Sequence, residues 1–289
     1  MKKQLIVNAD GFGFTRGVNR GIIQAVQHGI VRSTSALANM PAIEEVKDFQ
    51  EQFPEVSIGI HFNLSVGKPV SAPEEVRTLV DERGEFLREK FVPKLLTGRI
   101  SLSEMITELD NQVRRLVELG VHPTHFDGHQ NKHLYPQFFI AALHAAKKWG
   151  IKFMRSHNRY IFIGGKRRFV KLCWYYLSHP QRFVTHSVAR MLTWYAHING
   201  IKTADRLITP GYVDRSKKSS LETWLGIIET LPEGTSEIYC HPGYPDELLA
   251  RYATYVEERK IEVEVLTSPE LFKAIERNGI RLISFKDLL

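Results

Sequence analysis

The chain has 289 residues, of which 43% are hydrophobic and 25% are charged. This is ordinary globular composition, and it excludes a disordered or collagen-like chain. The two cysteines, Cys173 and Cys240, are too few for a disulfide scaffold or a four-cysteine zinc cluster, and they favour a reducing compartment. No apolar run reaches the roughly 18 residues of a membrane-spanning helix, and the first ten residues are too polar for a secretory leader. We therefore expect a cytoplasmic protein.

The net charge of +7 is unevenly distributed. No acidic residue occurs between Asp127 and Asp205, whereas that interval contains 13 lysines and arginines. Residues 159–201 within it are also rich in aromatic side chains. This segment predicts either buried helices with a solvated basic face or helices that rest on an anionic membrane, since Trp and Tyr with Lys and Arg suit the headgroup layer. No nucleic-acid-binding motif accompanies the charge, so we expect no nucleic-acid partner.

Short apolar runs alternate with longer stretches of helical periodicity along the chain. The runs predict strands at 4–8, 31–36, 57–63, 124–128, 152–155, 207–209, 237–240 and 281–284. The stretches predict helices at about 16–29, 42–52, 102–119, 136–149, 219–231, 246–258 and 268–278. This alternation indicates βα units and a parallel sheet. We expect an α/β fold, a single-domain (β/α) barrel over residues 1–289 that is irregular and TIM-barrel-like.

Two segments interrupt the alternation. Residues 67–99 are largely polar and contain prolines, which predicts a long excursion between two barrel units. Residues 159–201 are the second interruption, and they predict an inserted basic and aromatic helical segment.

The strongest sign of chemistry is the run HFDGH at 125–129, with His133 just beyond it. Side chains alternate between the faces of a strand, so we expect His125, Asp127 and His129 on one face. Three polar side chains of this kind are costly in a core unless they bind something. The run therefore predicts a ligand site.

A second strand repeats this pattern. Within 58–63, Gly59, His61 and Asn63 share one face of the strand. The functional residues of (β/α) barrels lie at the C-terminal ends of the strands. His61 and His129 could therefore supply two nitrogen ligands to one divalent metal.

Two more strands run into candidate site loops. Asp10 follows the first strand, next to Gly11 and close to Gly13, which permit tight turns. His241 ends another strand, directly before a proline and a glycine. An ordinary turn accounts for Asp10 and for the proline and glycine, but it does not account for a histidine at a strand end.

Together these motifs resemble the YdjC-like carbohydrate deacetylases, a family that includes chitooligosaccharide deacetylases and the hopanoid-associated HpnK proteins. The matching stretches, in the same order along the chain, are 8–13, 17–19, 33–35, 59–64, 123–129 and 241–244. The resemblance implies a (β/α)-barrel hydrolase that uses a divalent cation, Mg²⁺ or Zn²⁺, to remove the N-acetyl group of an amino sugar.

The resemblance also implies roles for single residues. The expected metal ligands are His61 and His129. Asp10 corresponds to the general base and His241 to the general acid. Arg155 would hold Asp10 in its charged form.

Further candidates surround these residues. Asp127 fits a position behind a histidine ligand, which it would orient. The other candidates for orienting the site or contacting the substrate are His125, His133 and Asn63.

The chain departs from the family at position 11. The family motif has a second aspartate there, expected to ligate the metal, whereas this chain has Gly11. Asn131 stands where many members have a third histidine. Three explanations stay open: Asp10 ligates the metal, water completes the shell, or the site is weakened. The missing carboxylate lowers affinity for Mg²⁺, and the remaining imidazoles favour Zn²⁺.

The leading hypothesis is metal-assisted hydrolysis of an N-acetylated sugar or glycolipid. One alternative is a degenerate barrel that only binds glycans, with Gly11 as its support, and another is a different metal-dependent barrel enzyme such as a sugar isomerase. Contact of 159–201 with an anionic membrane would favour a glycolipid substrate and a peripheral position at the inner face of the membrane. An oligomer is compatible with the sequence.

Overall fold

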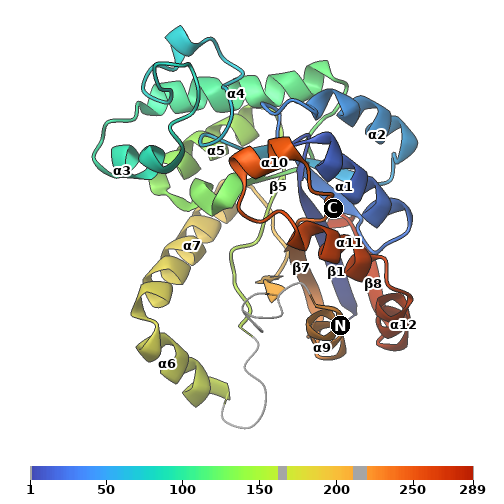
Figure 1. Ribbon diagram of the computed structural model, residues 1–289. Coiled ribbons are helices and arrows are strands. Elements are labelled where there is room, and N and C mark those ends of the chain that lie inside the picture. The colour runs from blue at the N-terminus through green and yellow to red at the C-terminus, as the bar shows by residue number, and fades with distance from the viewer. Residues whose placement is uncertain (1, 162–167, 211–219, 289) are drawn as a thin grey trace.

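A parallel sheet forms the centre of the molecule, and helices surround it (Figure 1). The computed structural model describes residues 2–161, 168–210 and 220–288. The strands in these ranges are β1 (Lys3–Phe12), β2 (Ser33–Ala36), β3 (Ser57–Phe62), β4 (His125–Gly128), β5 (Phe153–Met154), β6 (Arg206–Ile208), β7 (Gly234–Cys240) and β8 (Ile280–Ile283). Each matches a strand that the sequence predicts.

The α-helices of the described ranges are α1 (Arg16–Gln27), α2 (Val46–Gln52), α3 (Phe91–Leu96), α4 (Leu102–Glu118), α5 (Pro136–Lys148), α6 (Arg168–Ser178), α7 (Pro180–Ile198), α9 (Leu221–Glu229), α10 (Glu247–Tyr252), α11 (Glu258–Leu266) and α12 (Pro269–Arg277). Short 3₁₀ turns are η1 (Ile43–Glu45), η2 (Pro73–Glu75), η3 (Arg88–Lys90), η4 (His129–Leu134) and η5 (Phe285–Leu288). Side-chain caps mark several helix starts: Thr15 accepts from the Val18 amide at α1, and Ser220 accepts from the Thr223 amide at α9.

The strands follow the order β5-β4-β3-β2-β1-β7-β6, and β8 joins outside this path. β8 pairs with the first half of β1 and β2 with its second half, while β7 lies along the other edge of β1. Between β5 and β6 there is no continuous ladder in the described ranges, and isolated bridges such as Phe153 to Lys202 link the two sides. The sheet therefore curls into an irregular barrel, as the sequence predicts.

The interruption between β5 and β6 contains α6 and α7, which confirms the predicted helical insertion. In Figure 1, α7 leads away from the barrel and α6 follows it at the lower left, apart from the strands. The predicted excursion at 67–99 contains η2, η3 and α3. None of the helices in the described ranges has both the length and the apolar character needed to cross a membrane.

One predicted helix is wrong. The stretch 246–258 is not a single helix, because α10 ends at Tyr252 and α11 begins only at Glu258. Asp246 caps α10, and Ala253 leaves the helix in an extended conformation. The break turns Tyr255 toward the cavity described below, an outcome that helical periodicity cannot signal.

Candidate active site

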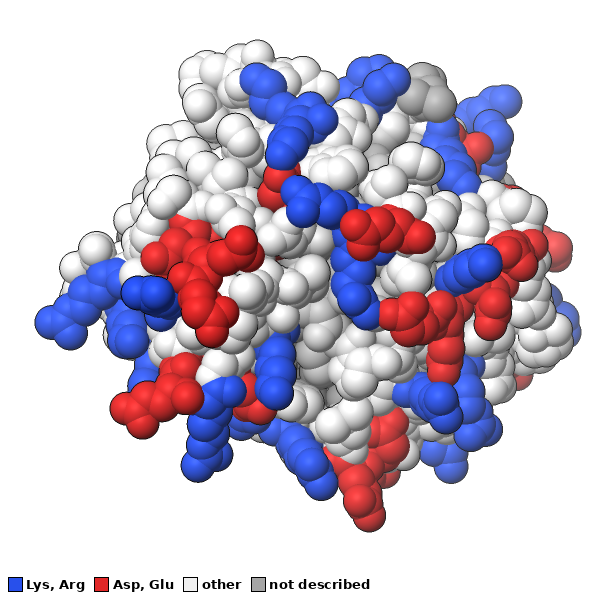
Figure 2. Space-filling model, turned by 90° about the horizontal axis from the view of Figure 1, so that it is seen from above, with Lys and Arg blue, Asp and Glu red and all other residues white. Residues whose placement is uncertain are grey.

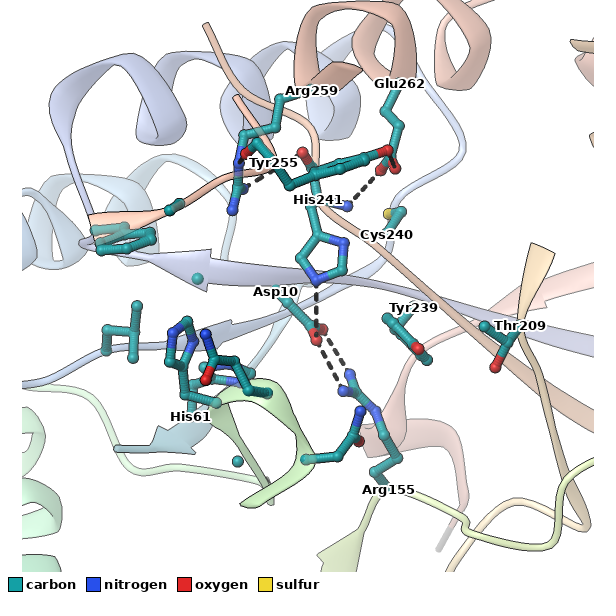
Figure 3. A pocket seen from close by; sticks show the side chains of 18 of the residues that line it. Asp10, His61, Arg155, Thr209, Tyr239, Cys240, His241, Tyr255, Arg259 and Glu262 are labelled. Atoms are coloured by element: carbon teal, nitrogen blue, oxygen red, sulfur yellow. Dashed lines mark hydrogen bonds and ion pairs between the residues drawn. The ribbon is translucent and has the colours of Figure 1, made fainter. Parts of the chain in front are cut away.

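A cavity of about 400 Å³ opens at the ends of the strands (Figure 3). Asp10 and Gly11 come from β1, His61 from β3, His129 from the turn after β4, and His241 from the loop after β7. Parallel strands bring their C-terminal ends to one edge, which is why residues far apart in sequence meet here. Seen from above, basic and acidic side chains intermingle over the surface of the molecule (Figure 2).

Arg155 organises the floor of the cavity. Its Nη1 donates to Asp10 Oδ2 at 2.8 Å and its Nη2 to Asp10 Oδ1 at 2.5 Å. Nη2 also lies 2.6 Å from Asp127 Oδ2, and Nε donates to Glu237 Oε1 at 2.9 Å. The guanidinium is 1% exposed, so this group of three carboxylates and one cation is almost free of water. Its formal charge of −2 with all three carboxylates ionised matches a divalent cation.

Burial and the local charges shift the pKa values of this group. Burial alone would raise the pKa of Asp127, but Arg155 and His61 outweigh it and hold this pKa well below its usual range. Burial also works against the charge of Arg155, yet Asp10 and Asp127 raise the pKa of the guanidinium. Burial raises the pKa of Glu237 to about 7, although Arg155 acts in the opposite direction.

The Nδ1 atom of His61 fixes the orientation of the imidazole ring through contacts with Asp127 and Ser35. Nδ1 lies 2.6 Å from Asp127 Oδ1 and 3.2 Å from Ser35 Oγ, and Ser35 donates to Asp127 at 3.0 Å. An ionised Asp127 can only accept, so Nδ1 carries the proton and Nε2 keeps a free lone pair. Atoms of ligand type from Asp10, His61 and Asp127 all lie within 4.8 Å of one another. This arrangement suits a divalent metal.

His129 faces His61 edge-on, with ring centroids 5.6 Å apart. Its Nε2 is buried and finds no hydrogen-bond partner among the described residues. Burial, followed by the nearby His61, lowers the pKa of His129 well below its usual value. A neutral imidazole with an unpartnered nitrogen beside the site is the form that binds metals. The orphaned nitrogen and the excess of carboxylates fit a divalent cation.

His241 lies on another side of Asp10, with Nε2 3.9 Å from Asp10 Oδ2 (Figure 3). Its main-chain amide donates to Glu262, and Arg259 donates to its carbonyl oxygen at 3.4 Å. Burial lowers the pKa of His241 to about 3, with a smaller contribution from Arg259 and against the raising effect of Asp10. The imidazole is thus neutral at pH 7, while 35% of its side chain still faces the opening.

The other predicted residues lie around this centre. Asp127 contacts Nδ1 of His61, the side of the ring away from the free Nε2. His125 points into the sheet, where Nε2 lies 3.1 Å from Asn8 Oδ1 and the ring stacks on Phe285. Asn63 accepts from the amides of Ser65 and Val66 and so closes a turn.

His133 is paired with His157, their Nε2 atoms 2.8 Å apart. His125, Asn63 and His133 are not among the residues that line the cavity. We expected His125, Asp127 and His129 to point to the same face of one strand. The structure differs, because β4 ends at Gly128 and His129 belongs to the 3₁₀ turn η4.

Several residues of the site escaped the sequence analysis. Glu237 is buried, and it is the first residue of a predicted apolar strand. An acidic residue at such a position could have been recognised as a candidate site residue. Glu262 accepts from Tyr255 Oη at 2.5 Å. Nothing in the sequence indicated that Tyr255 and Arg259 line the cavity, because their position depends on the break between α10 and α11, which was not predicted.

A parallel barrel with histidines and carboxylates around a cavity at its strand ends defines a metal-site α/β protein of the hydrolase type. The chain belongs to the YdjC-like family, whose model, described as "YdjC-like protein", matches residues 4–277.

Named relatives are similar over their whole length. A "carbohydrate deacetylase" of Thermoanaerobacter pseudethanolicus is 34% identical over 99% of both chains. A "chitooligosaccharide deacetylase" of Serratia marcescens is 32% identical over 100% of both. A crystal structure from Enterococcus faecalis V583, named as a candidate cellobiose-phosphate cleavage protein, covers 100% of this chain and 99% of its own, with 31% identity and a TM-score of 0.75.

Proposed function

We propose that this protein is a metal-dependent carbohydrate deacetylase that hydrolyses the N-acetyl group of an amino sugar. The observation that carries the proposal is the position of Asp10, which has ligand-type atoms within 4.8 Å of His61 and lies 3.9 Å from His241. One carboxylate thus adjoins both a metal-type histidine and a second histidine suited to proton transfer. The full-length relatives named as carbohydrate and chitooligosaccharide deacetylases support the same reaction.

His61 and His129 would hold the cation, and the buried carboxylates around Arg155 would balance its charge. When bound, a divalent cation supplies a Lewis acid for the acetyl carbonyl and lowers the pKa of a coordinated water. Two imidazoles and the absence of a carboxylate at Gly11 favour Zn²⁺ over Mg²⁺.

Asp10 is the proposed general base. Arg155 donates to both of its oxygens, which fixes the orientation of the carboxylate. As the water oxygen bonds to the acetyl carbon, Asp10 accepts the proton of that water. The C–N bond then breaks, and the products are acetate and a free amine.

His241 is the proposed proton donor to the departing nitrogen. It is neutral before reaction and lies 3.9 Å from Asp10, so it can receive the proton that Asp10 has taken. A histidine with a lowered pKa is a strong acid once protonated, which favours transfer to the amine. Tyr239, Tyr252 and Phe14 give the cavity aromatic walls of the kind that small-ligand sites use.

Acetate release from N,N′-diacetylchitobiose tests the proposal. The metal-free protein should be inactive, and Zn²⁺ should restore release. Asp10→Asn and His241→Ala should each lower kcat by about 10²–10⁴-fold with little change in fold. A protein that binds the sugar with metal present but releases no acetate would instead be the glycan-binding barrel.

We further propose that α6 and α7 contact an anionic membrane surface, which would favour a membrane-borne glycolipid as substrate. α7 buries one face, with Ala189, Leu192 and Ala196. The large apolar side chains exposed on the two helices are Val170, Trp174, Leu177, Phe183, Val184, Met191, Trp194, Tyr195 and Ile198. A surface helix usually presents a polar outer face, so this apolar face requires a partner.

The positive charge around α6 and α7 favours an anionic membrane as the partner of this apolar face. The interval that contains both helices has no acidic residue between Asp127 and Asp205. Contact between two copies through this face would bring like charges together, whereas an anionic leaflet is complementary to it. Each Lys or Arg near such a leaflet contributes about 1 kcal/mol, and inserted aromatic side chains add to the binding.

Co-sedimentation with phosphatidylserine-containing vesicles tests this contact. Binding should be clear at low salt, weaken at high salt, and fall when Trp174 and Trp194 are both changed to Ser. Leu96→Ser, which alters an exposed leucine on α3, is the matched control and should bind as wild type does. Charge reversal at 166–168 should also release the protein, although Lys166 and Arg167 lie outside the described residues. Wild type that ignores these vesicles at low salt, or binds neutral vesicles equally well, would contradict the proposal.

A further inference from the structure

The turn that follows β4 has an unusual backbone. Gln130 and Asn131 adopt positive φ angles of 55° and 54°, and among the described non-glycine residues only Arg88 shares this feature. Left-handed backbone is unfavourable for residues with a side chain, although asparagine tolerates it better than most. Such strain persists where the surrounding structure uses it to place a group.

The turn places two unpartnered polar atoms at one cavity. His129 and Asn131 both line it, together with His61. His129 Nε2 and Asn131 Oδ1 are each buried without a hydrogen-bond partner in the described part of the chain. A buried carbonyl oxygen that accepts nothing is costly, so native proteins rarely leave one in this state. Amide oxygens are, however, ordinary ligands of divalent cations.

Another lining position of the cavity lacks the carboxylate that the family has there. Gly11 lines the same cavity with a φ of +97°, and a Cβ built on it would meet only Leu37, at 3.8 Å. A Cβ at this position would therefore meet no clash, although the positive φ would strain any side chain there. The oxygen ligand missing from this position has to come from elsewhere if the site is to bind a cation tightly.

We infer that Asn131 supplies a metal ligand through Oδ1 and compensates for Gly11. This inference rests on the metal site of the proposed function and identifies one of its ligands. The ligand set of His61, His129 and Asn131 is neutral, so the cation is balanced by the buried carboxylates around Arg155 instead. A neutral set with two imidazoles selects Zn²⁺ over Mg²⁺.

Replacement of the side chain by glycine tests the inference. Asn131→Gly removes Oδ1 and tolerates the positive φ, so the turn is preserved. Gln130→Gly is the matched control, because it makes the same change at the neighbouring strained position. The dissociation constant of Zn²⁺ is measured by competition with a chromophoric chelator, and the visible absorption of the Co²⁺-loaded protein reports the ligand set.

Asn131→Gly should weaken Zn²⁺ binding by about 10–100-fold and alter the Co²⁺ spectrum. Gln130→Gly should stay within about twofold of wild type. Unchanged Zn²⁺ affinity and Co²⁺ spectrum in Asn131→Gly, or an equal loss in Gln130→Gly, would overturn the inference. His61→Ala separates this outcome from a failure of the proposed function. If it loses Zn²⁺ while Asn131→Gly does not, only the inference fails, and if it binds Zn²⁺ as wild type does, the proposed site itself is wrong.

Discussion

Glu237→Gln offers a quantitative test of the buried charges beneath the cavity. Glu237 accepts from Arg155 Nε at 2.9 Å and from the Ser156 amide at 3.0 Å, and it is fully buried. Arg155 is shared with two other carboxylates, so it cannot fully compensate the burial of a third. This is why the pKa of Glu237 is raised to about 7. The glutamine is nearly isosteric but cannot ionise.

The direction of the pH effect follows from this shift. The pKa of Glu237 is 4.5 in its ordinary state and about 7 in the folded protein. Between these values the folded state keeps a proton that the unfolded state has lost, so the free energy of unfolding decreases as pH rises. The full change corresponds to about 3 kcal/mol, complete once the pH passes 7. The hydrogen bond that glutamine loses costs about 1 kcal/mol at every pH and does not alter the slope.

Urea unfolding of the metal-free protein at pH 5 and pH 8 measures the effect. Titrating groups remote from position 237 contribute equally to both proteins and cancel in the difference between wild type and Glu237→Gln. We expect the stability of wild type relative to the variant to fall by about 2.5 kcal/mol from pH 5 to pH 8. A difference that is the same at both pH values, or that rises with pH, would refute the argument that burial outweighs Arg155.

Two more predictions concern the metal site. His61→Ala and His129→Ala should each remove bound metal, measured by elemental analysis, with the far-UV circular dichroism unchanged; full occupancy in either variant would exclude that residue as a ligand. Gly11→Asp should tighten Mg²⁺ binding and raise the deacetylation rate, because it restores the acidic ligand of the family motif at a position where a Cβ meets only Leu37, at 3.8 Å. It should also lower the melting temperature, since φ is +97° there. A lower rate with unchanged folding would mean that Asp10 already ligates the metal and that the new carboxylate repels or crowds it.

Much of the fold could be predicted from hydrophobic periodicity. The strands of the sheet are short apolar runs between polar turns, and the spacing of β3 and β4 placed His61 and His129 at strand ends. The division of β1 between β2 and β8 could not be predicted, because pairing depends on contacts far apart in sequence. The break between α10 and α11 was missed because both sides have helical periodicity.

The sequence could predict those site residues that lie on or directly after a strand, but not the contacts between residues of different strands. Asp10 was expected in a loop after the first strand, but β1 continues to Phe12 and contains it, whereas His241 directly follows β7. The structure places the two side chains 3.9 Å apart. Arg155 was expected to hold Asp10 in its charged form, and it does contact both oxygens of that carboxylate. Its simultaneous contact with Glu237 could not be predicted, because it depends on strands far apart in sequence. The orphaned oxygen of Asn131 was hidden because backbone dihedral angles are not legible in a sequence.

An anomalous-scattering map of crystals grown with Zn²⁺ tests the central claim most directly. The account predicts one strong peak in the cavity, within bonding distance of His61 Nε2 and His129 Nε2. A cavity without a peak at full Zn²⁺ loading, or a peak bound instead between His133 and His157, would contradict it.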